Sequence, residues 1–379
     1  MRVLVLDETR PGESRVALVP DHVTTLIGFG LSVAVMSDAG RAAFFDDALY
    51  AAKGADVVPT NLRNEAINRA DVVLTVRTLD ELDVARLKPG ALTLSFLQPL
   101  ASLDVITTLA GAKASAMSFE LIPRISRAQS MDALTSQALV AGYRAGLVAA
   151  ELLPRFFPLF MTAAGTIPPA KVLVLGAGVA GLQAIATAKR LGAVVSAYDV
   201  RPASADEVRS MGATFVSLDL DALEGSGGYA REMSEDRATR QRELLAPYVA
   251  SSDVVITTAA VPGRNAPMLV TSAMVEAMAP GSVVVDLASE TGGNVEGSVA
   301  GEVIEIGGTA VWGALDVPSQ MPVHASQLYS ANVTAVLKLL TTEGEIVLDV
   351  EDEIVDAALV VHDGTVRNES ARVALGQGA

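Results

Sequence analysis

Short apolar runs rich in β-branched residues alternate with amphipathic segments through the first third of the chain. Four of these runs have the length of buried strands: residues 2–6, 32–36, 71–76 and 91–97. Three segments between them have the length and period of helices: residues 20–29, 80–87 and 101–110. Alternation of this kind is typical of parallel strands covered by helices on both faces, so an α/β domain is expected here.

A second series of the same kind begins at Lys171, after a predicted helix at residues 138–153 and several prolines. Its expected strands are residues 172–176, 194–198, 253–258, 282–286 and 309–313. Residues 222–243 carry several glycines and then a charged run, and they interrupt the series. We predict a long, partly flexible loop there.

The last part of the chain contains a predicted helix from about Ser326 and strand-like runs at 345–349 and 359–362. No further complete α/β series begins there, so this tail is expected to return to the first domain. The sequence therefore predicts two Rossmann-like α/β domains with parallel sheets, the second inserted in the first. Residues 1–137 and 326–379 form the first domain in this interpretation, and residues 138–325 form the second.

The composition argues against several classes of function. The chain has 379 residues, a formal net charge of -16 and no cluster of Lys and Arg, which argues against binding of nucleic acid or anionic lipid. It has no cysteine, so thiol chemistry is excluded, and its three histidines are too scattered to suggest zinc. The acidic run Asp349–Glu353 is interpreted as solvated surface, and no metal site is predicted.

The sequence gives no indication of a targeting or membrane-spanning segment. The N-terminus enters a strand-like run directly, without the pattern of a signal peptide. Residues 172–188 are free of charge, but three glycines interrupt them and they are at the lower limit of a span. A cytoplasmic protein without a membrane span is therefore the expectation.

The same charge-free run carries a glycine motif. Gly176-Ala-Gly178-Val-Ala-Gly181 follows an apolar strand directly and opens a predicted helix. Such glycines allow a tight turn and close approach of a pyrophosphate, and the helix N-terminus offers free N–H groups. Asp199 ends the next strand, where its carboxylate can accept hydrogen bonds from an adenosine ribose. A carboxylate there would repel a 2′-phosphate, which favours NAD(H) over NADP(H), although Arg201 lies two residues later.

A dense polar stretch separates the two series. Six polar residues fall within fourteen positions of a chain that is 50% hydrophobic: Arg124, Arg127, Gln129, Asp132, Thr135 and Gln137. Groups of this kind must meet water, each other or a ligand. Nearer the N-terminus, Arg15 lies in the run Glu13–Pro20 and is either a surface arginine after a turn or a member of an anion site.

Three motifs point to one superfamily: Glu13–Pro20, the glycine motif and Ser282–Gly293. Together they resemble the alanine dehydrogenases and NAD(P) transhydrogenase α subunits. Three further segments are similar to the transhydrogenase side: Pro123–Asp132, Met161–Pro169 and Gly227–Met233. The resemblance covers nearly the whole chain.

Two positions distinguish the branches by their chemistry. An alanine dehydrogenase resembling this chain would carry a histidine where this chain has Gln98, and an aspartate where it has Glu290. An amide side chain cannot act as a general acid or base near neutral pH. The missing acid–base pair suits direct hydride transfer between two nicotinamides.

The resemblance also implies a role for individual residues. Arg124, Asp132 and Thr135 would hold the nicotinamide end of NAD(H), and Gln129 would reach toward the nucleotide on a partner. The implied contacts with the rest of NAD(H) are Gly176, Gly178, Val179, Ala180, Gly181, Asp199, Val200, Arg201, Gly228, Gln241 and Ala260. Tyr229 would form the tip of a mobile loop that closes over the nucleotide.

The function that the resemblance implies is the NAD(H)-binding component of a proton-translocating transhydrogenase. Such a component would be a homodimer on the cytoplasmic side of the inner membrane, with NADP(H) bound by a β subunit and the membrane crossed by a separate segment of the α subunit. This chain departs from the family at Thr135, usually Ser, at Ala138–Leu139, usually Ser-Asn, and at Gln320, usually Arg.

Two other interpretations remain open. One is a self-contained amino-acid dehydrogenase that binds a substrate carboxylate through Arg15. The other is a non-catalytic NAD-sensing module, in which residues 222–243 report occupancy to a partner.

Overall fold

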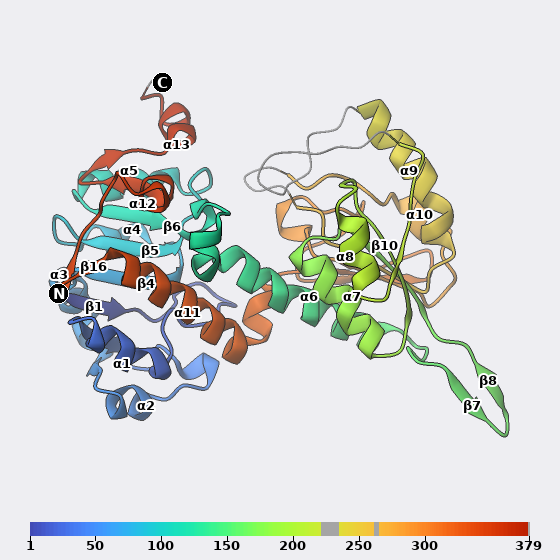
Figure 1. The fold of residues 1–379 in the computed structure, drawn as a ribbon, viewed down its shortest axis with the longest axis horizontal. Coiled ribbons are helices and arrows are strands. Elements are labelled where there is room, and N and C mark those ends of the chain that lie inside the picture. Colours follow the sequence, from blue (N-terminus) through green and yellow to red (C-terminus); the bar gives the residue numbers. More distant parts are fainter. Residues whose placement is uncertain (221–234, 261–264, 378–379) are drawn as a thin grey trace. The chain divides into compact units, whose positions relative to one another are not determined.

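A computed structural model of the chain describes residues 1–220, 235–260 and 265–377. The chain divides into two compact units, which are visible in Figure 1. Unit 1 consists of Met1–Gln137 and Pro318–Ala379, and unit 2 consists of Ala138–Val317. We expected the return to the first domain at residue 326, but the division falls at Pro318. The reason is that α11 (Pro322–Leu340) buries its apolar face in the core of unit 1 from its first turns onward.

Unit 1 is built on an eight-stranded sheet with the order β19-β18-β6-β5-β4-β1-β2-β3. In that order the strands are β19 (Thr365–Val366), β18 (Leu359–His362), β6 (Ser115–Ser118), β5 (Leu92–Phe96), β4 (Val72–Arg77), β1 (Arg2–Val5), β2 (Ser32–Met36) and β3 (Asp56–Val58). The parallel pattern is confirmed from β3 to β6, whereas β18 runs antiparallel to both of its neighbours. A two-residue turn joins β18 to β19, and so short a connection permits only an antiparallel pair.

Helices cover this sheet and share one apolar core with it. Besides α11, they are α1 (Pro20–Gly28), α2 (Asp47–Ala52), α3 (Arg63–Arg69), α4 (Glu81–Val84), α5 (Leu103–Gly111), α12 (Glu353–Ala358) and α13 (Glu369–Ala374). Both α1 and α11 begin with a proline, whose fixed φ suits the first helical position and whose missing N–H would have no partner there. Strands β16 (Thr341–Thr342) and β17 (Glu345–Ile346) form a separate antiparallel pair.

Unit 2 is built on a seven-stranded sheet with the order β11-β10-β9-β12-β13-β15-β14. In that order the strands are β11 (Thr214–Phe215), β10 (Val194–Tyr198), β9 (Lys171–Leu175), β12 (Val254–Thr257), β13 (Val283–Asp286), β15 (Thr309–Gly313) and β14 (Val303–Ile306). All pairs are parallel except β14 with β15. The helices are α6 (Ala133–Leu152), which begins in unit 1, α7 (Val179–Arg190), α8 (Ser204–Ser210), α9 (Glu235–Ala250) and α10 (Ser272–Glu276).

The alternation of side chains along β9 produces two cores, one on each face of the sheet. Val172 and Val174 pack with Ala184 of α7, whereas Leu173 and Leu175 belong to the cluster that contains Leu245 of α9. Because both faces are covered, these strands are apolar throughout, as the sequence indicated.

Three segments differ from expectation. The predicted loop at 222–243 ends in a helix, because α9 starts at Glu235; the remainder of that loop lies outside the described residues. A hairpin of β7 (Phe160–Thr162) and β8 (Gly165–Ile167) was not predicted, and it extends from unit 2 as a two-stranded ribbon (Figure 1). Among the described helices, none combines the length and apolar character needed to cross a membrane.

Candidate functional site

The glycine motif lies where the strand order of unit 2 reverses. Counted from β9, the order is 3-2-1-4-5-6, and ligands of such sheets bind beyond the carboxyl ends of the strands at the reversal, between β9 and β12. Gly176 follows β9 and Thr258 follows β12, and the Thr258 hydroxyl donates a hydrogen bond to the carbonyl of Gly176 at 3.0 Å. The motif is therefore fixed at the expected ligand-binding edge of the sheet.

The three glycines of the motif have three different structural reasons. Gly176 has a φ of 101°, which side chains rarely adopt. A Cβ at Gly181 would lie 1.9 Å from the carbonyl oxygen of Gly176, so only glycine lets α7 approach the turn this closely. A Cβ at Gly178 would meet no described heavy atom within 4 Å. The space beside Gly178, at the N-terminus of α7, is open to a ligand phosphate.

Asp199 lies next to this turn at the end of β10. Its side chain is only 7% exposed. One oxygen accepts the backbone N–H of Ala177, inside the glycine motif, at 2.7 Å. Burial opposes ionisation, but the hydrogen bonds from Arg201 and Ala177 outweigh it and hold the pKa of Asp199 below its ordinary value. Asp199 is therefore a carboxylate at neutral pH.

Arg201 occupies the remaining acceptor positions of Asp199. Its backbone N–H and Nε donate to Oδ1 at 2.8 and 2.9 Å, and its Nη2 donates to Oδ2 at 2.9 Å. With Ala177, these are four hydrogen bonds, about as many as a carboxylate accepts. A ribose hydroxyl could bind Asp199 only if the Arg201 side chain released it. The turn fits a dinucleotide, provided that Arg201 moves.

Other residues assigned to the nucleotide lie around the same edge of unit 2. Gln241, on α9, is 2% exposed, and its Oε1 is buried without a hydrogen-bond partner among the described residues. A buried amide oxygen of this kind is costly unless a ligand donor or water meets it. Ala260 follows β12 and is exposed, and Val179, Val200 and Ala180 line the turn half-buried. Gly228 and Tyr229 lie outside the described residues.

Sequence reasoning missed the two side chains that hold the loops beside this edge. Asp286, fully buried at the end of β13, accepts the backbone N–H groups of Ala288, Asn294 and Val295 at 3.0 to 3.2 Å. Asn294 bonds both the N–H and the carbonyl of Ala259. The available signal was a carboxylate closing an apolar run that precedes two glycines.

The polar stretch of unit 1 is a short 3-10 helix, Ser126–Met131, followed by the start of α6. Arg124 and Gln129 are exposed, and Asp132 and Thr135 are half-buried. Asp132 accepts the backbone N–H of Thr135 at 2.9 Å and its hydroxyl at 2.6 Å. This is the geometry of a helix N-cap. Asp132 and Thr135 thus stabilise the first turn of α6, whatever else they do.

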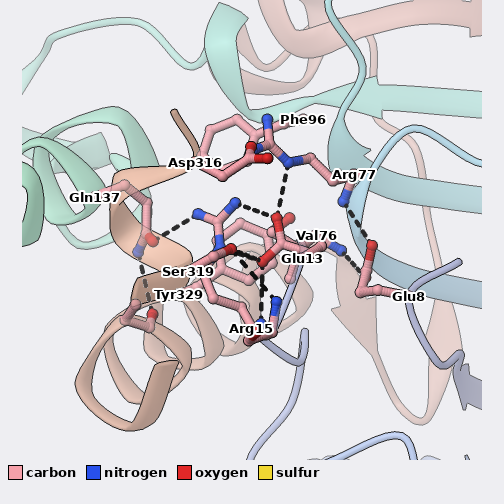
Figure 2. Close-up of polar contacts among 12 residues, drawn as sticks. Glu8, Glu13, Arg15, Val76, Arg77, Phe96, Gln137, Asp316, Ser319 and Tyr329 are labelled. Atoms are coloured by element: carbon pink, nitrogen blue, oxygen red, sulfur yellow. Dashed lines mark hydrogen bonds and ion pairs between the residues drawn. The ribbon is translucent and has the colours of Figure 1, made fainter. Parts of the chain in front are cut away.

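Arg15 is buried in a polar network of unit 1, drawn in Figure 2. Its Nε and Nη2 donate to Glu13 at 2.7 and 2.6 Å, and its Nη1 donates to Gln137 at 2.8 Å. Glu13 also accepts hydrogen bonds from Arg77, at 2.8 Å, and from Ser319. Burial disfavours the charge of Glu13, but its bonds to Arg15 prevail and lower its pKa to about 2.

This network lies where the strand order of unit 1 reverses, beyond the ends of β1 and β4. Glu8 follows β1 and accepts the backbone N–H groups of Val76 and Arg77 at 2.6 and 3.2 Å. Burial raises the pKa of Glu8 to about 7. Each nitrogen of the Arg15 guanidinium already donates to a protein side chain, so a substrate carboxylate would have to displace Glu13 or Gln137. The interpretation of Arg15 as an exposed surface residue is wrong.

The two positions that distinguish the branches lie in different units. Gln98, after β5, is exposed and has a φ of 48°. Its backbone N–H is held by the carboxylate of Glu120 at 3.1 Å. Glu290, in unit 2, is exposed, and it accepts the backbone N–H of Asp316 at 2.8 Å.

Comparison with known proteins identifies the family. Residues 4–141 match the N-terminal domain, and residues 145–369 the C-terminal domain, of the family described as alanine dehydrogenase/PNT. The chain is 44% identical to the first of the polypeptides that make up NAD(P) transhydrogenase subunit alpha of Rhodospirillum rubrum, with both proteins covered completely. The crystal structure of transhydrogenase from Sinorhizobium meliloti is 41% identical and has a TM-score of 0.85, over 98% of this chain and 100% of that one.

Alanine dehydrogenase of Mycobacterium tuberculosis is 32% identical, over 79% of this chain and 75% of that protein. The two transhydrogenases are thus more similar to this chain, over more of its length. The chain therefore belongs to the family of alanine dehydrogenases and NAD(P) transhydrogenase alpha subunits.

Proposed function

We propose that this chain is the NAD(H)-binding component of a proton-translocating NAD(P) transhydrogenase, transferring hydride between NADH and NADP+ bound on a partner subunit. The observation that carries the proposal is the turn after β9, where an open backbone position at Gly178 lies at a helix N-terminus, one strand from the carboxylate of Asp199. The full-length similarity to a transhydrogenase subunit supports it.

The chain's own residues would bind and orient NAD(H), which itself supplies the hydride. The N–H groups of Val179 and Ala180 would meet the pyrophosphate, because they open α7 beside Gly178. Asp199 would bind the adenosine ribose after Arg201 releases it. The unpartnered Oε1 of Gln241 is available to a ligand donor.

The nicotinamide end would be held by the polar stretch of unit 1. Arg124 and Gln129 present polar groups to the surface, and Asp132 and Thr135 lie half-buried beside them. Direct hydride transfer needs no acid–base group, only two reacting carbons held about 3–3.5 Å apart in a site that excludes water. Rate would then depend on how rigidly this stretch is positioned.

Two features speak against a self-contained amino-acid dehydrogenase. Gln98 cannot exchange a proton with substrate. Arg15 is committed to Glu13 and Gln137, so the guanidinium is not available to a carboxylate without breaking a buried ion pair.

The partners follow from the same proposal. NADP(H) would be bound by a β subunit, and the proton path would lie in membrane-spanning subunits, so that this chain is peripheral on the cytoplasmic side of the inner membrane. We also propose a homodimer. The β7–β8 hairpin supports it, because a two-stranded ribbon is marginal alone, and Phe160, Met161 and Ile167 are 42%, 76% and 42% exposed.

The decisive experiment combines the purified chain with a soluble NADP(H)-binding domain of a transhydrogenase. Reduction of an NADP+ analogue by NADH is followed by absorbance. Turnover that requires both proteins supports the proposal. Oxidation of NADH by the chain alone with pyruvate and ammonia would instead establish the dehydrogenase, and NADH binding without turnover in either assay would leave only a sensor.

A narrower test separates binding from positioning. Asp132→Asn keeps an oxygen that caps α6 but removes the charge, and Arg124→Ala removes the neighbouring guanidinium. Both should slow single-turnover hydride transfer far more than they raise the NADH dissociation constant. Asp80→Asn is the matched control, because Asp80 caps α4 in the same unit by accepting the N–H of Asp83. A loss of NADH affinity alone would make Asp132 and Arg124 simple binding groups.

A further inference from the structure

Asn332, in the middle of α11, touches the polar stretch on both sides of Asp132. Its Nδ2 donates to the carbonyl of Ser130 at 2.9 Å, and its Oδ1 accepts the hydroxyl of Ser136 at 2.8 Å. Asn332 is 7% exposed. Both ends of one buried amide are therefore used to join residues that lie two positions before and four positions after Asp132.

The backbone around Asp132 is held weakly by its own local bonds. Asp132 has φ -74° and ψ 87°, so it is a non-helical link between the 3-10 helix and α6. Its N–H reaches the carbonyl of Gln129 only at 3.4 Å, and its carbonyl receives the N–H of Ser136 at 3.2 Å. These are long hydrogen bonds. The side chain from α11 supplies the shorter contacts on both sides of the link.

The contact continues into the buried network of unit 1. The hydroxyl of Ser136 also accepts Nε2 of Gln137 at 3.1 Å. Gln137 in turn bonds the carbonyl of Ala325, on α11, and Nη1 of Arg15. Asn332 is thus the end of a continuous polar path that ties the start of α6 to α11. A buried group in such a path is expensive to leave unpaired.

We infer that Asn332 is a positioning residue for hydride transfer: it fixes the link at Asp132 so that the polar stretch presents the nicotinamide at one geometry. The inference rests on the proposed function. It predicts that loss of the amide reduces the rate of the hydride step, because a displacement of about 1 Å in a positioning group can cost up to a hundredfold. Affinity for NADH, most of which would be bound by unit 2, should change little.

The experiment uses the full chain with the soluble NADP(H)-binding domain, and measures single-turnover hydride transfer and NADH affinity. Asn332→Ala removes both hydrogen bonds, and we expect transfer to slow about tenfold to a hundredfold. Ser136→Ala keeps the contact with Ser130 and should slow transfer less. Tyr329→Phe is the matched control, because it removes a buried hydrogen bond from the same helix, to the carbonyl of Thr75, without touching the polar stretch.

A fourth variant supplies a pH readout. Asn332→Asp keeps the acceptor for Ser136 but turns a carboxylate oxygen toward the carbonyl of Ser130. Once protonated, that oxygen can donate again, and burial raises the pKa of such a carboxyl. The transfer rate of Asn332→Asp relative to the native chain should therefore rise as the pH falls, which a purely structural defect would not produce.

The outcomes separate the two proposals. Transfer by Asn332→Ala as fast as by the native chain, or an equal loss in Tyr329→Phe, overturns the role of Asn332 alone. No transfer by the native chain overturns the proposed function and this inference with it. If Asn332→Ala does not fold, the decision passes to Ser136→Ala and Asn332→Asp. A slower step in both, with NADH affinity within about threefold of native, supports the inference, and native rates in both overturn it.

Discussion

Replacing Glu13 by Gln tests whether the buried network of unit 1 depends on one negative charge. The Glu13 side chain is fully buried, and two arginines, Arg15 and Arg77, donate to it. Its pKa falls from 4.5 to about 2. At about 1.4 kcal/mol for each pH unit, the charged form contributes roughly 3 kcal/mol to folding. Removing one partner of a buried ion pair costs about 3–5 kcal/mol, which agrees.

The sign follows from the direction of the pKa. A carboxyl group whose pKa is lowered by folding stabilises the fold above its ordinary pKa, and that contribution is lost as the pH falls from about 4.5 to about 2. The difference between the native chain and Glu13→Gln should therefore be largest near pH 7. Some of it should already be lost at pH 3.

The assay is urea unfolding followed by two signals. The single tryptophan, Trp312, lies in unit 2, so its fluorescence reports that unit, whereas circular dichroism reports both. With a slope of about 2 kcal/mol per molar urea, the transition of unit 1 should move down by about 1.5 M in Glu13→Gln. The tryptophan transition should stay in place. Asp206→Asn, which disrupts an exposed ion pair with Arg209, should change neither.

Glu8 provides the opposite case. Burial raises its pKa to about 7, so its ionisation destabilises the fold, and stability should fall as the pH rises from about 4.5 to 7. Glu8→Gln should therefore be more stable than the native chain above pH 7, and the gain should disappear below pH 4.5. Equal stability of Glu13→Gln and the native chain at pH 7 would refute the reasoning for the network.

Three other predictions concern the proposed nucleotide site. Gly178→Val should leave the melting temperature unchanged, because its Cβ meets open space, but should weaken NADH binding at least about tenfold in calorimetry; a lower melting temperature with native affinity would contradict this. Asp199→Asn should weaken NADH binding about tenfold and reduce discrimination against NADPH, as measured by competitive titration. Arg127 makes a bidentate pair with Asp352. Arg127→Gln and Asp352→Asn should each slow hydride transfer by about threefold, and the double variant by no more; additive losses would show that the two residues act separately.

Much of the nucleotide site could be predicted from the sequence, because its signals are local. The turn at Gly176, the helix after it and the carboxylate of Asp199 lie within one βαβ unit, and each position follows from the chain next to it. The N-cap at Asp132 was also visible, as an aspartate three residues before Thr135. It was missed because the polar density of the stretch was attributed to a ligand alone.

Other features depended on residues far apart. Glu13 meets Ser319 and Gln137 meets Arg15 only because the tail of the chain folds back onto unit 1. Strand β6, Ser115–Ser118, has little intrinsic preference for a strand, and it becomes one because it pairs with β5 in the middle of the sheet.

By itself, the sequence determined where the buried strands lie and how the glycine turn is built, because apolar periodicity and backbone freedom act over a few neighbouring residues. Only the tertiary structure decided that Arg15 is held by Glu13, that Arg201 covers Asp199, and that Asn332 holds both sides of Asp132. Hydrogen bonds and ion pairs of buried groups are set by which distant segments pack together, and no local pattern records that packing.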